Sequence, residues 1–172
     1  MKGLIIYCSV YGTTEQYAEW IGTEVSLKKN NYKMISESDI KNCDFLVIGS
    51  FVLAHKLAIS RWLRKKQELL KEKQLFIFSV SGAKPGSKEL DTVFSDSLPQ
   101  PLLMKSKTYQ FGGKMRYEDL TGFHKLMMKI GTFIEKDPKV KADMKRDMKV
   151  AKNNVDIKFI EPLVNDLKEY MK

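Results

Sequence analysis

Residues 4–14 read Leu-Ile-Ile-Tyr-Cys-Ser-Val-Tyr-Gly-Thr-Thr, and this stretch decides the fold class. The run from Leu4 to Cys8 is apolar throughout, which is typical of a strand buried on both faces of a parallel sheet. A hydroxyl-rich turn around Gly12 follows, and a helical apolar pattern begins at Thr14. Free backbone N–H groups and the positive end of a helix dipole meet in such a turn, so the junction predicts an anion site.

The turn itself favours a phosphate as the anion. Gly12 lets the backbone pass close to a ligand, and hydroxyls can donate to phosphate oxygens without adding charge. The turn contains neither Gly-x-Gly-x-x-Gly nor Gly-x-x-x-x-Gly-Lys, which favours a monophosphate over a dinucleotide or a nucleoside triphosphate. An ordinary strand-to-helix turn with a threonine cap is the alternative. The predicted phosphate-binding residues are Ser9, Val10, Tyr11, Gly12, Thr13 and Thr14.

Composition limits the number of domains and the classes of partner. The chain has 172 residues, 43% of them hydrophobic, which predicts one domain over residues 1–172. It contains no run of about 18 apolar residues and no leader-like start, so we expect a cytoplasmic protein without a transmembrane span or a signal peptide. The formal net charge of +9 indicates acidic or anionic partners. Nucleic acid is disfavoured, because no helix-turn-helix, zinc-binding or aromatic sheet motif accompanies the charge.

Short apolar runs alternate with amphipathic stretches along the rest of the chain. The predicted strands are 4–8, 32–35, 44–50, 75–80 and 109–112, and the predicted helices are 14–29, 59–71, 88–96 and 162–171. Strands separated by helical segments predict right-handed βαβ units. The fold class is therefore α/β, with a five-stranded parallel sheet and helices on both faces. Ligands bind at the carboxyl edge of such a sheet.

Residues 113–154 form a long segment between the last predicted strand and the last predicted helix. An amphipathic helix is expected from Glu118, and its apolar face either joins the core or forms a surface for a membrane, a partner or an apolar substrate. Residues 136–152 carry seven basic and three acidic side chains. This excess indicates either a solvated connection or a surface that attracts anionic lipid head groups or an acidic redox partner.

The two cysteines, Cys8 and Cys43, fall at the end of one predicted strand and just before another. They form no Cys-x-x-Cys motif, and no histidine cluster accompanies them. We therefore expect buried thiols rather than redox chemistry, and no metal site.

Three segments resemble the flavodoxin-like family. Residues 9–14 are similar to its phosphate-binding loop, and residues 47–55 to a loop that packs against the flavin ring. Residues 111–117 resemble the last strand of menaquinone-dependent protoporphyrinogen IX dehydrogenases. The resemblance implies a flavodoxin-like three-layer sandwich that binds FMN, with a helical insertion near the last strand. It also implies that the flavin is lined by Ser50, Phe51, Val52, Leu53, Ala54 and His55, and by Ser81, Gly82 and Ala83.

This resemblance predicts a protein of redox electron transfer and leaves its class open. One class is an electron carrier for a redox partner protein, although the loops lack the Trp and Tyr that many such carriers stack on the ring. Another is a quinone-dependent dehydrogenase at the inner face of a membrane, with His55 as a proton donor and Arg116 holding an acidic substrate group. Alternatively, His55 and Arg116 are ordinary residues of a basic surface with no role in catalysis. The third class is a flavin-free binding protein that kept the fold.

Overall fold

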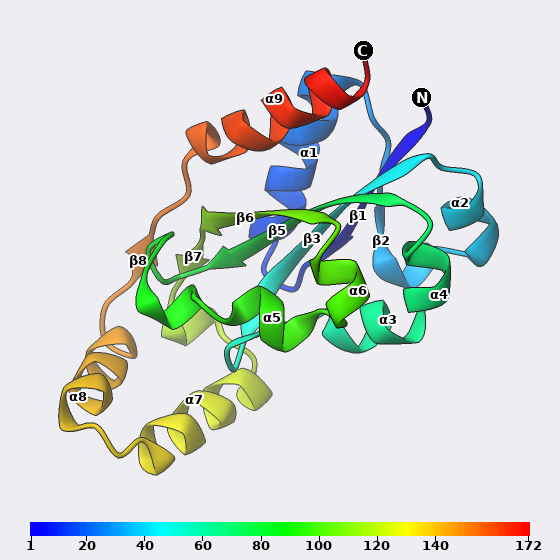
Figure 1. The fold of residues 1–172 in the computed structure, drawn as a ribbon. Helices are drawn as coiled ribbons and strands as arrows, with labels where there is room; N and C mark the ends of the chain where they lie inside the picture. Colours follow the sequence, from blue (N-terminus) through cyan, green and yellow to red (C-terminus); the bar gives the residue numbers. More distant parts are fainter.

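The computed structural model describes residues 1–172, with the side chains of all residues except Asp143 and Asp147. Five parallel strands form the central sheet in the order β2-β1-β3-β5-β6. Their bounds are β1 Gly3–Cys8, β2 Lys29–Asn31, β3 Phe45–Leu53, β5 Gln74–Ser81 and β6 Ser106–Gly112. A short strand, β4 (Lys56–Leu57), folds back antiparallel on the end of β3. Helices lie on both faces of the sheet (Figure 1), which confirms the predicted α/β fold.

Alternate side chains of the strands build two cores, one on each face of the sheet. In β1, Leu4 and Ile6 belong to one core, and Ile5 and Tyr7 belong to the other. The Ile5 face is covered by α1 (Thr13–Val25) and α9 (Glu161–Tyr170), which follows the 3-10 turn η4 (Ile157–Ile160). Short helices cover the opposite face: α2 Glu37–Lys41, α3 Ser60–Lys65, α4 Gln67–Leu70, α5 Val93–Ser97 and α6 Gln100–Leu103. Cover on both faces explains why the central strands are apolar along their whole length.

The structure corrects three of the predicted elements. The strand predicted at 32–35 is wrong, because β2 ends at Asn31 and Tyr32–Met34 forms the 3-10 turn η1. Tyr32 and Ile35 nevertheless pack against the core, which accounts for the apolar signal there. The helix predicted at 59–71 is divided at Lys66 into α3 and α4. The segment 88–96 holds a 3-10 turn, η2 (Lys88–Leu90), followed by α5.

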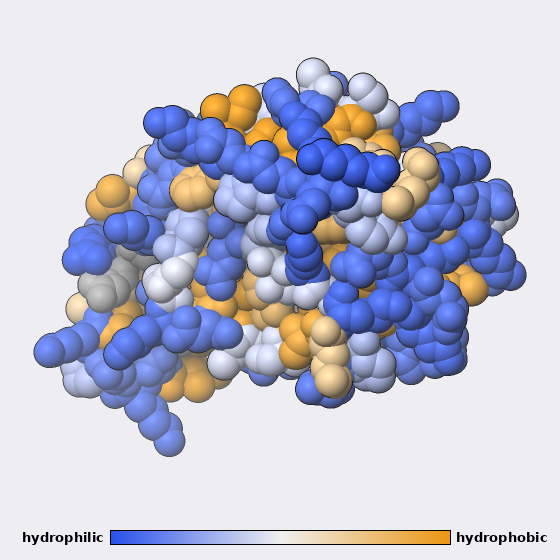
Figure 2. Space-filling model, turned by 45° about the horizontal axis from the view of Figure 1, so that its top comes forward, coloured by the Kyte–Doolittle hydropathy of each residue, from blue (hydrophilic) through white to orange (hydrophobic). Residues whose placement is uncertain are grey.

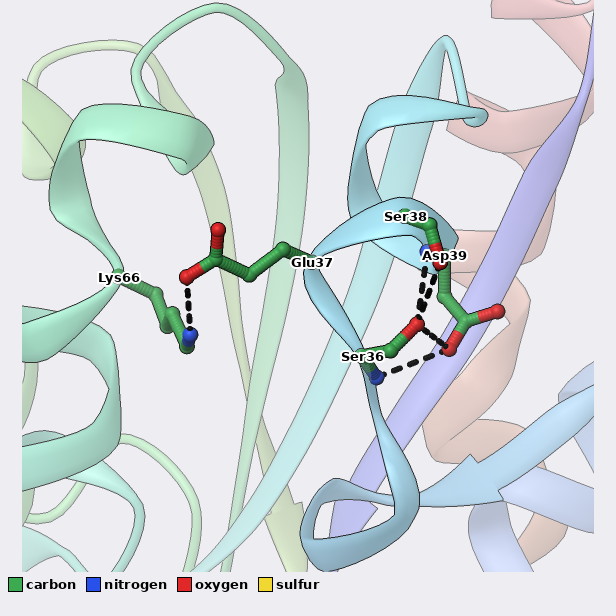
Figure 3. A network of polar contacts seen from close by, with 5 residues as sticks. All are labelled: Ser36, Glu37, Ser38, Asp39 and Lys66. Atoms are coloured by element: carbon green, nitrogen blue, oxygen red, sulfur yellow. Dashed lines mark hydrogen bonds and ion pairs between the residues drawn. The ribbon is translucent and has the colours of Figure 1, made fainter.

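The helix α2 was not among the predicted elements, and polar contacts hold its first turn (Figure 3). The Asp39 N–H group donates to Ser36 Oγ at 3.2 Å, and the Ser36 N–H group donates to Asp39 Oδ2 at 2.9 Å. Lys66 Nζ lies 2.8 Å from Glu37 Oε1 and joins α2 to the junction of α3 and α4. This capping box stabilises a helix that is too short to persist alone.

The segment between β6 and α9 leaves the layered core. Two strands, β7 (Lys114–Met115) and β8 (Lys152–Asn153), pair antiparallel at its base, so the chain departs and returns at one point. We call residues 114–153 the α7–α8 hairpin, which Figure 1 shows projecting beyond the sheet. It contains the 3-10 turn η3 Tyr117–Asp119, α7 Gly122–Ile134 and α8 Pro138–Asp147.

Both halves of the hairpin bear on the sequence predictions. The amphipathic helix expected from Glu118 forms, but it begins at Gly122 with Thr121 as its cap. The basic second half forms the helix α8, which begins where the carboxylate of Asp137 accepts from the N–H groups of Lys139 and Val140. Among the residues that the structure describes, no helix is both long enough and apolar enough to cross a bilayer.

Candidate functional site

A cavity of about 220 Å³ lies at the carboxyl edge of the sheet. It opens between the loops that follow β1, β3 and β5 and the base of the α7–α8 hairpin. Eleven of the fifteen residues predicted from sequence line it: Ser9, Val10, Tyr11, Thr13, Thr14, Phe51, Val52, Leu53, Ala54, Ser81 and Gly82. Three loops that lie far apart in the sequence therefore meet at one place, because parallel strands end at the same edge.

The N-terminus of α1 forms one end of the cavity. Gly12 precedes the helix with φ 83°, a left-handed conformation that suits glycine, and no side chain caps the first turn. Thr13 and Thr14, the first two residues of the helix, line the cavity. Because the first N–H groups of a helix have no partner within it, this end offers donors and a positive dipole to a ligand. The arrangement suits an anion.

Four predicted residues do not line the cavity, namely Gly12, Ser50, His55 and Ala83. The N–H groups of Gly12 and Ala83 bond within their own loops, to Ser9 Oγ and Ser81 Oγ respectively, each at 3.1 Å. Ser50 is fully buried, and its hydroxyl accepts from the Ile59 N–H group at 3.2 Å. This hydroxyl therefore fixes the turn beneath the site rather than facing a ligand.

His55 also lies outside the cavity, and the backbone explains why. Ala54 and His55 both have left-handed backbone angles, with φ of 48° and 60°, where the chain turns from β3 into β4. Such angles are uncommon outside glycine and reverse the chain within two residues. Ala54 still lines the cavity, whereas His55 is exposed beyond it. His55 therefore does not line the cavity, and its expected contact with a flavin ring stays a prediction.

Arg116, predicted to hold an acidic substrate group, is not a lining residue. Its side chain is about half exposed, and its Nε lies 3.9 Å from Asp119 Oδ2, one helical turn further along. The guanidinium group therefore points to a local carboxylate in the arrangement that the structure describes.

The hairpin supplies a wall that the sequence did not indicate. Its lining residues are Lys114, Met115, Leu120, His124 and Met128. Gly113, just before the hairpin, and Val80 in β5 complete the set. Nδ1 of His124 contacts the Tyr11 hydroxyl, which also accepts from the Thr121 N–H group at 3.1 Å. The His124 ring lies 6.0 Å from the Phe51 ring. His124 therefore joins α7 to two of the predicted loops.

The charges around the cavity favour an anionic ligand with an apolar part. Among the lining side chains, all of which the structure describes, there is no carboxylate. Lys114 is a basic lining residue, while most of the other walls are aliphatic or aromatic. A phosphate would meet the helix end and the hydroxyls of Ser9 and Thr13, and a flat apolar group would meet the walls.

The two cysteines are both buried free thiols, as predicted. Burial raises the pKa of Cys8 to about 11, so the thiol stays protonated near neutrality and is a weak nucleophile. In the part of the chain that the structure describes, no three His, Cys, Asp or Glu side chains converge to hold a metal ion.

Comparison with known proteins identifies the family. Flavodoxin 1 from Bacillus cereus has 14% identity and a TM-score of 0.50, with 78% of this chain and 100% of that chain covered. The Trp repressor binding protein from Bacillus subtilis has 15% identity and a TM-score of 0.51, with 79% and 99% covered. At these identities the likeness shows the fold alone. A search of curated proteins found no match. A family model described as "Flavodoxin domain" matches residues 4–141, most of the sequence, and the chain therefore belongs to the flavodoxin domain family.

Proposed function

We propose that this chain binds FMN in the cavity and acts in redox electron transfer. One observation carries the proposal: an uncapped helix N-terminus and a carboxylate-free, largely apolar wall meet in one cavity at the carboxyl edge of the sheet. FMN combines a phosphate with a flat, largely apolar ring system, and the two ends of the cavity match these two parts. The flavin supplies the redox chemistry, and the protein supplies binding, orientation and exclusion of water.

The phosphate end is assigned to the loop between β1 and α1. Ser9 and Thr13 offer hydroxyl donors, and the first turn of α1 offers backbone N–H groups. The Ser9 hydroxyl accepts from the Gly12 N–H group, so its own proton is free to be donated to a phosphate oxygen. The ring end is assigned to Phe51–Ala54 and Ser81–Gly82, which line the neighbouring walls.

His124 places an imidazole at the wall of this cavity. The Tyr11 hydroxyl accepts from Thr121, so its proton is available to Nδ1 of His124. The neutral imidazole then carries its proton on Nε2. We assign to His124 the role that was expected of His55, which is to hold or deliver a proton beside the bound ring.

The second candidate is a quinone-dependent dehydrogenase of the protoporphyrinogen type. The observation that favours it is the α7 side of the cavity, where Met115, Leu120 and Met128 form an apolar wall. A wall of this kind suits an apolar organic substrate or a quinone. A carrier that meets a redox partner protein instead exposes the ring edge to that partner.

Titration with FMN and with riboflavin tests the cofactor assignment. We expect the apoprotein to bind FMN about tenfold or more tightly than riboflavin, because riboflavin lacks the phosphate. Replacing Thr13 and Thr14 by valine should weaken FMN binding by a similar factor and leave riboflavin binding nearly unchanged. Thr108→Val, an exposed position on β6, is the matched control. Equal affinity for FMN and riboflavin, or no binding of either, contradicts the proposal.

A second experiment separates the two classes of function. The FMN-loaded protein is reduced anaerobically and mixed either with a short-chain menaquinone analogue or with a flavodoxin reductase system. Fast oxidation by the quinone, together with porphyrinogen oxidation, supports the dehydrogenase. Fast exchange with the reductase and a stable one-electron reduced flavin support the carrier.

A further inference from the structure

The helix α7 has two unlike faces. His124 and Met128 face the cavity, and Thr132 is buried. The other face carries large apolar side chains in contact with solvent: Phe123 is 62% exposed, Leu126 54%, Ile130 42%, Phe133 83% and Ile134 65%. At about 100° per residue, these five fall within an arc of roughly 100° around the helix axis. They form a continuous strip, which we call the α7 stripe.

Exposed apolar side chains are concentrated in this hairpin. Seven of the fourteen exposed large hydrophobic residues among those that the structure describes lie between Phe123 and Val150. The others, such as Met34 and Met104, are spread over the rest of the surface. Single exposed hydrophobic residues are ordinary, but a contiguous patch marks an interaction surface.

Basic side chains accompany the α7 stripe. Lys129 lies next to it on α7, and Lys139 and Lys145 are exposed on α8. Residues 136–152 contain seven basic and three acidic residues, and the whole chain carries +9. In Figure 2, orange hydrophobic patches lie between blue hydrophilic side chains at the lower left, the end where the hairpin projects.

We propose that the α7–α8 hairpin docks on an anionic lipid bilayer. The α7 stripe lies in the boundary between head groups and acyl chains, as amphipathic interfacial helices do. The lysines of α7 and α8 rest on the anionic head groups, with their aliphatic stems along the apolar layer. This proposal concerns the outer face of α7 and does not depend on which cofactor occupies the cavity.

Charge complementarity favours a bilayer over the other partners that could cover the α7 stripe. A second copy of this chain would bring two strongly basic hairpins together, which like-charge repulsion opposes. An acidic protein would match the charge, yet a narrow apolar strip along one helix, with Lys129 beside it, has the form of a helix that lies in a lipid interface.

Vesicle co-sedimentation of the full chain tests the proposal. The probes are vesicles of phosphatidylcholine alone and vesicles with roughly a quarter phosphatidylglycerol. We expect binding to the anionic vesicles to exceed binding to the neutral ones by about tenfold or more, and to weaken as salt screens the charges. Equal binding to both, or binding to neither, overturns the proposal.

Matched variants locate the surface. Phe133→Ser combined with Ile134→Ser should reduce binding to anionic vesicles by about tenfold or more, since both side chains leave the lipid. Met34→Ser combined with Met104→Ser is the control, because these residues are 78% and 80% exposed outside the hairpin. All four side chains are exposed, so thermal unfolding should be nearly unchanged in both variants. Equal losses in the two variants overturn the assignment to α7.

The charge contribution has its own pair of variants with equal net charge. Lys139→Gln with Lys145→Gln should weaken vesicle binding more than Lys28→Gln with Lys65→Gln, whose lysines are exposed outside the hairpin. Analytical ultracentrifugation without lipid tests self-association. A dimer that is lost on serine substitution of Phe133 and Ile134, with no vesicle binding by the wild type, would show that a second copy covers the stripe.

Discussion

The central sheet and the α7–α8 hairpin use the same residue types in opposite ways. In the sheet, Ile48 and Phe78 are completely buried, and they form the two cores with the covering helices. In the hairpin, Phe123 and Phe133 face solvent, and Thr132 is the buried residue of α7. Apolar surface that is buried stabilises the fold, whereas apolar surface left exposed is available for binding. Hydrophobic content alone therefore does not locate the core of this chain.

The largest expected effect comes from truncating one phenylalanine in each region. Phe78 stacks on Phe111 with ring centroids 4.9 Å apart, and Phe78→Ala should lower the free energy of unfolding by about 3–5 kcal/mol. Phe133→Ala should change the free energy of unfolding by about 0.5 kcal/mol or less, because the Phe133 ring is mostly exposed and buries little surface. Urea unfolding measures both. A large loss for Phe133→Ala would mean that the hairpin contributes to the core.

Next in size is a pair of glycine substitutions, at the base of the hairpin and at the start of α7. A Cβ at Gly112 would lie 2.1 Å from the carbonyl oxygen of Asn154, so Gly112→Ala should destabilise by about 1–3 kcal/mol. A Cβ at Gly122 meets nothing within 4 Å, and Gly122→Ala should stabilise α7 by up to about 1 kcal/mol. Thermal unfolding of both variants checks this difference, and similar shifts would contradict it.

Tyr17 tests how the hairpin base is tied to α1. Its buried hydroxyl donates to the Gly112 carbonyl oxygen at 2.7 Å and accepts from the Asp156 N–H group at 3.1 Å. Tyr17→Phe leaves both backbone groups without this partner and should lower the free energy of unfolding by about 1–3 kcal/mol. Tyr170→Phe at the end of α9 is the control, with little change expected. Equal effects in the two variants would show that the two bonds of the Tyr17 hydroxyl add nothing to stability.

The smallest effect concerns the contact of β6 with α9, and it depends on pH. The Tyr109 hydroxyl donates to Asp166, and Lys107 Nζ lies 2.9 Å from the same carboxylate. These two bonds hold the pKa of Asp166 below its usual value. The stabilisation is therefore complete above the unfolded pKa of about 4 and is lost as pH falls through the lower folded pKa.

Tyr109→Phe should accordingly cost about 0.5–1.5 kcal/mol near neutral pH. The difference from wild type should narrow in acid, because protonated Asp166 accepts a weaker hydrogen bond. Urea unfolding over a pH series measures the change. If the stability difference between Tyr109→Phe and wild type stayed constant well below about pH 4, Asp166 would contribute nothing to that difference.

The central sheet could be predicted because its strands are unbroken apolar runs that end in turn residues. The edge strand β2, Lys29–Asn31, could not, because it contains no apolar residue and pairs only with β1. The helix α8 was hidden by its lysine-rich composition. Its local signal was Asp137 followed by proline, a capping residue and a first-turn residue that together favour a helix start.

The loops of the site could also be predicted, because each directly follows a buried strand. His124 could not, because it lies 113 residues after Tyr11 and no local pattern connects the two. The sequence instead indicated His55, which directly follows loop residues that line the cavity. Its left-handed backbone, together with that of Ala54, was not visible in a stretch without glycine.

Tyr11 belongs to the loop beside α1, yet its hydroxyl contacts both Thr121 and His124 at the beginning of α7. One phenol oxygen thus links the region that would hold a phosphate to the region that would meet lipid. A ligand that tightens or loosens this link at one end must alter affinity at the other by the same factor, since binding equilibria are reciprocal. Measured with and without anionic vesicles, the dissociation constant of FMN would report the strength of that coupling.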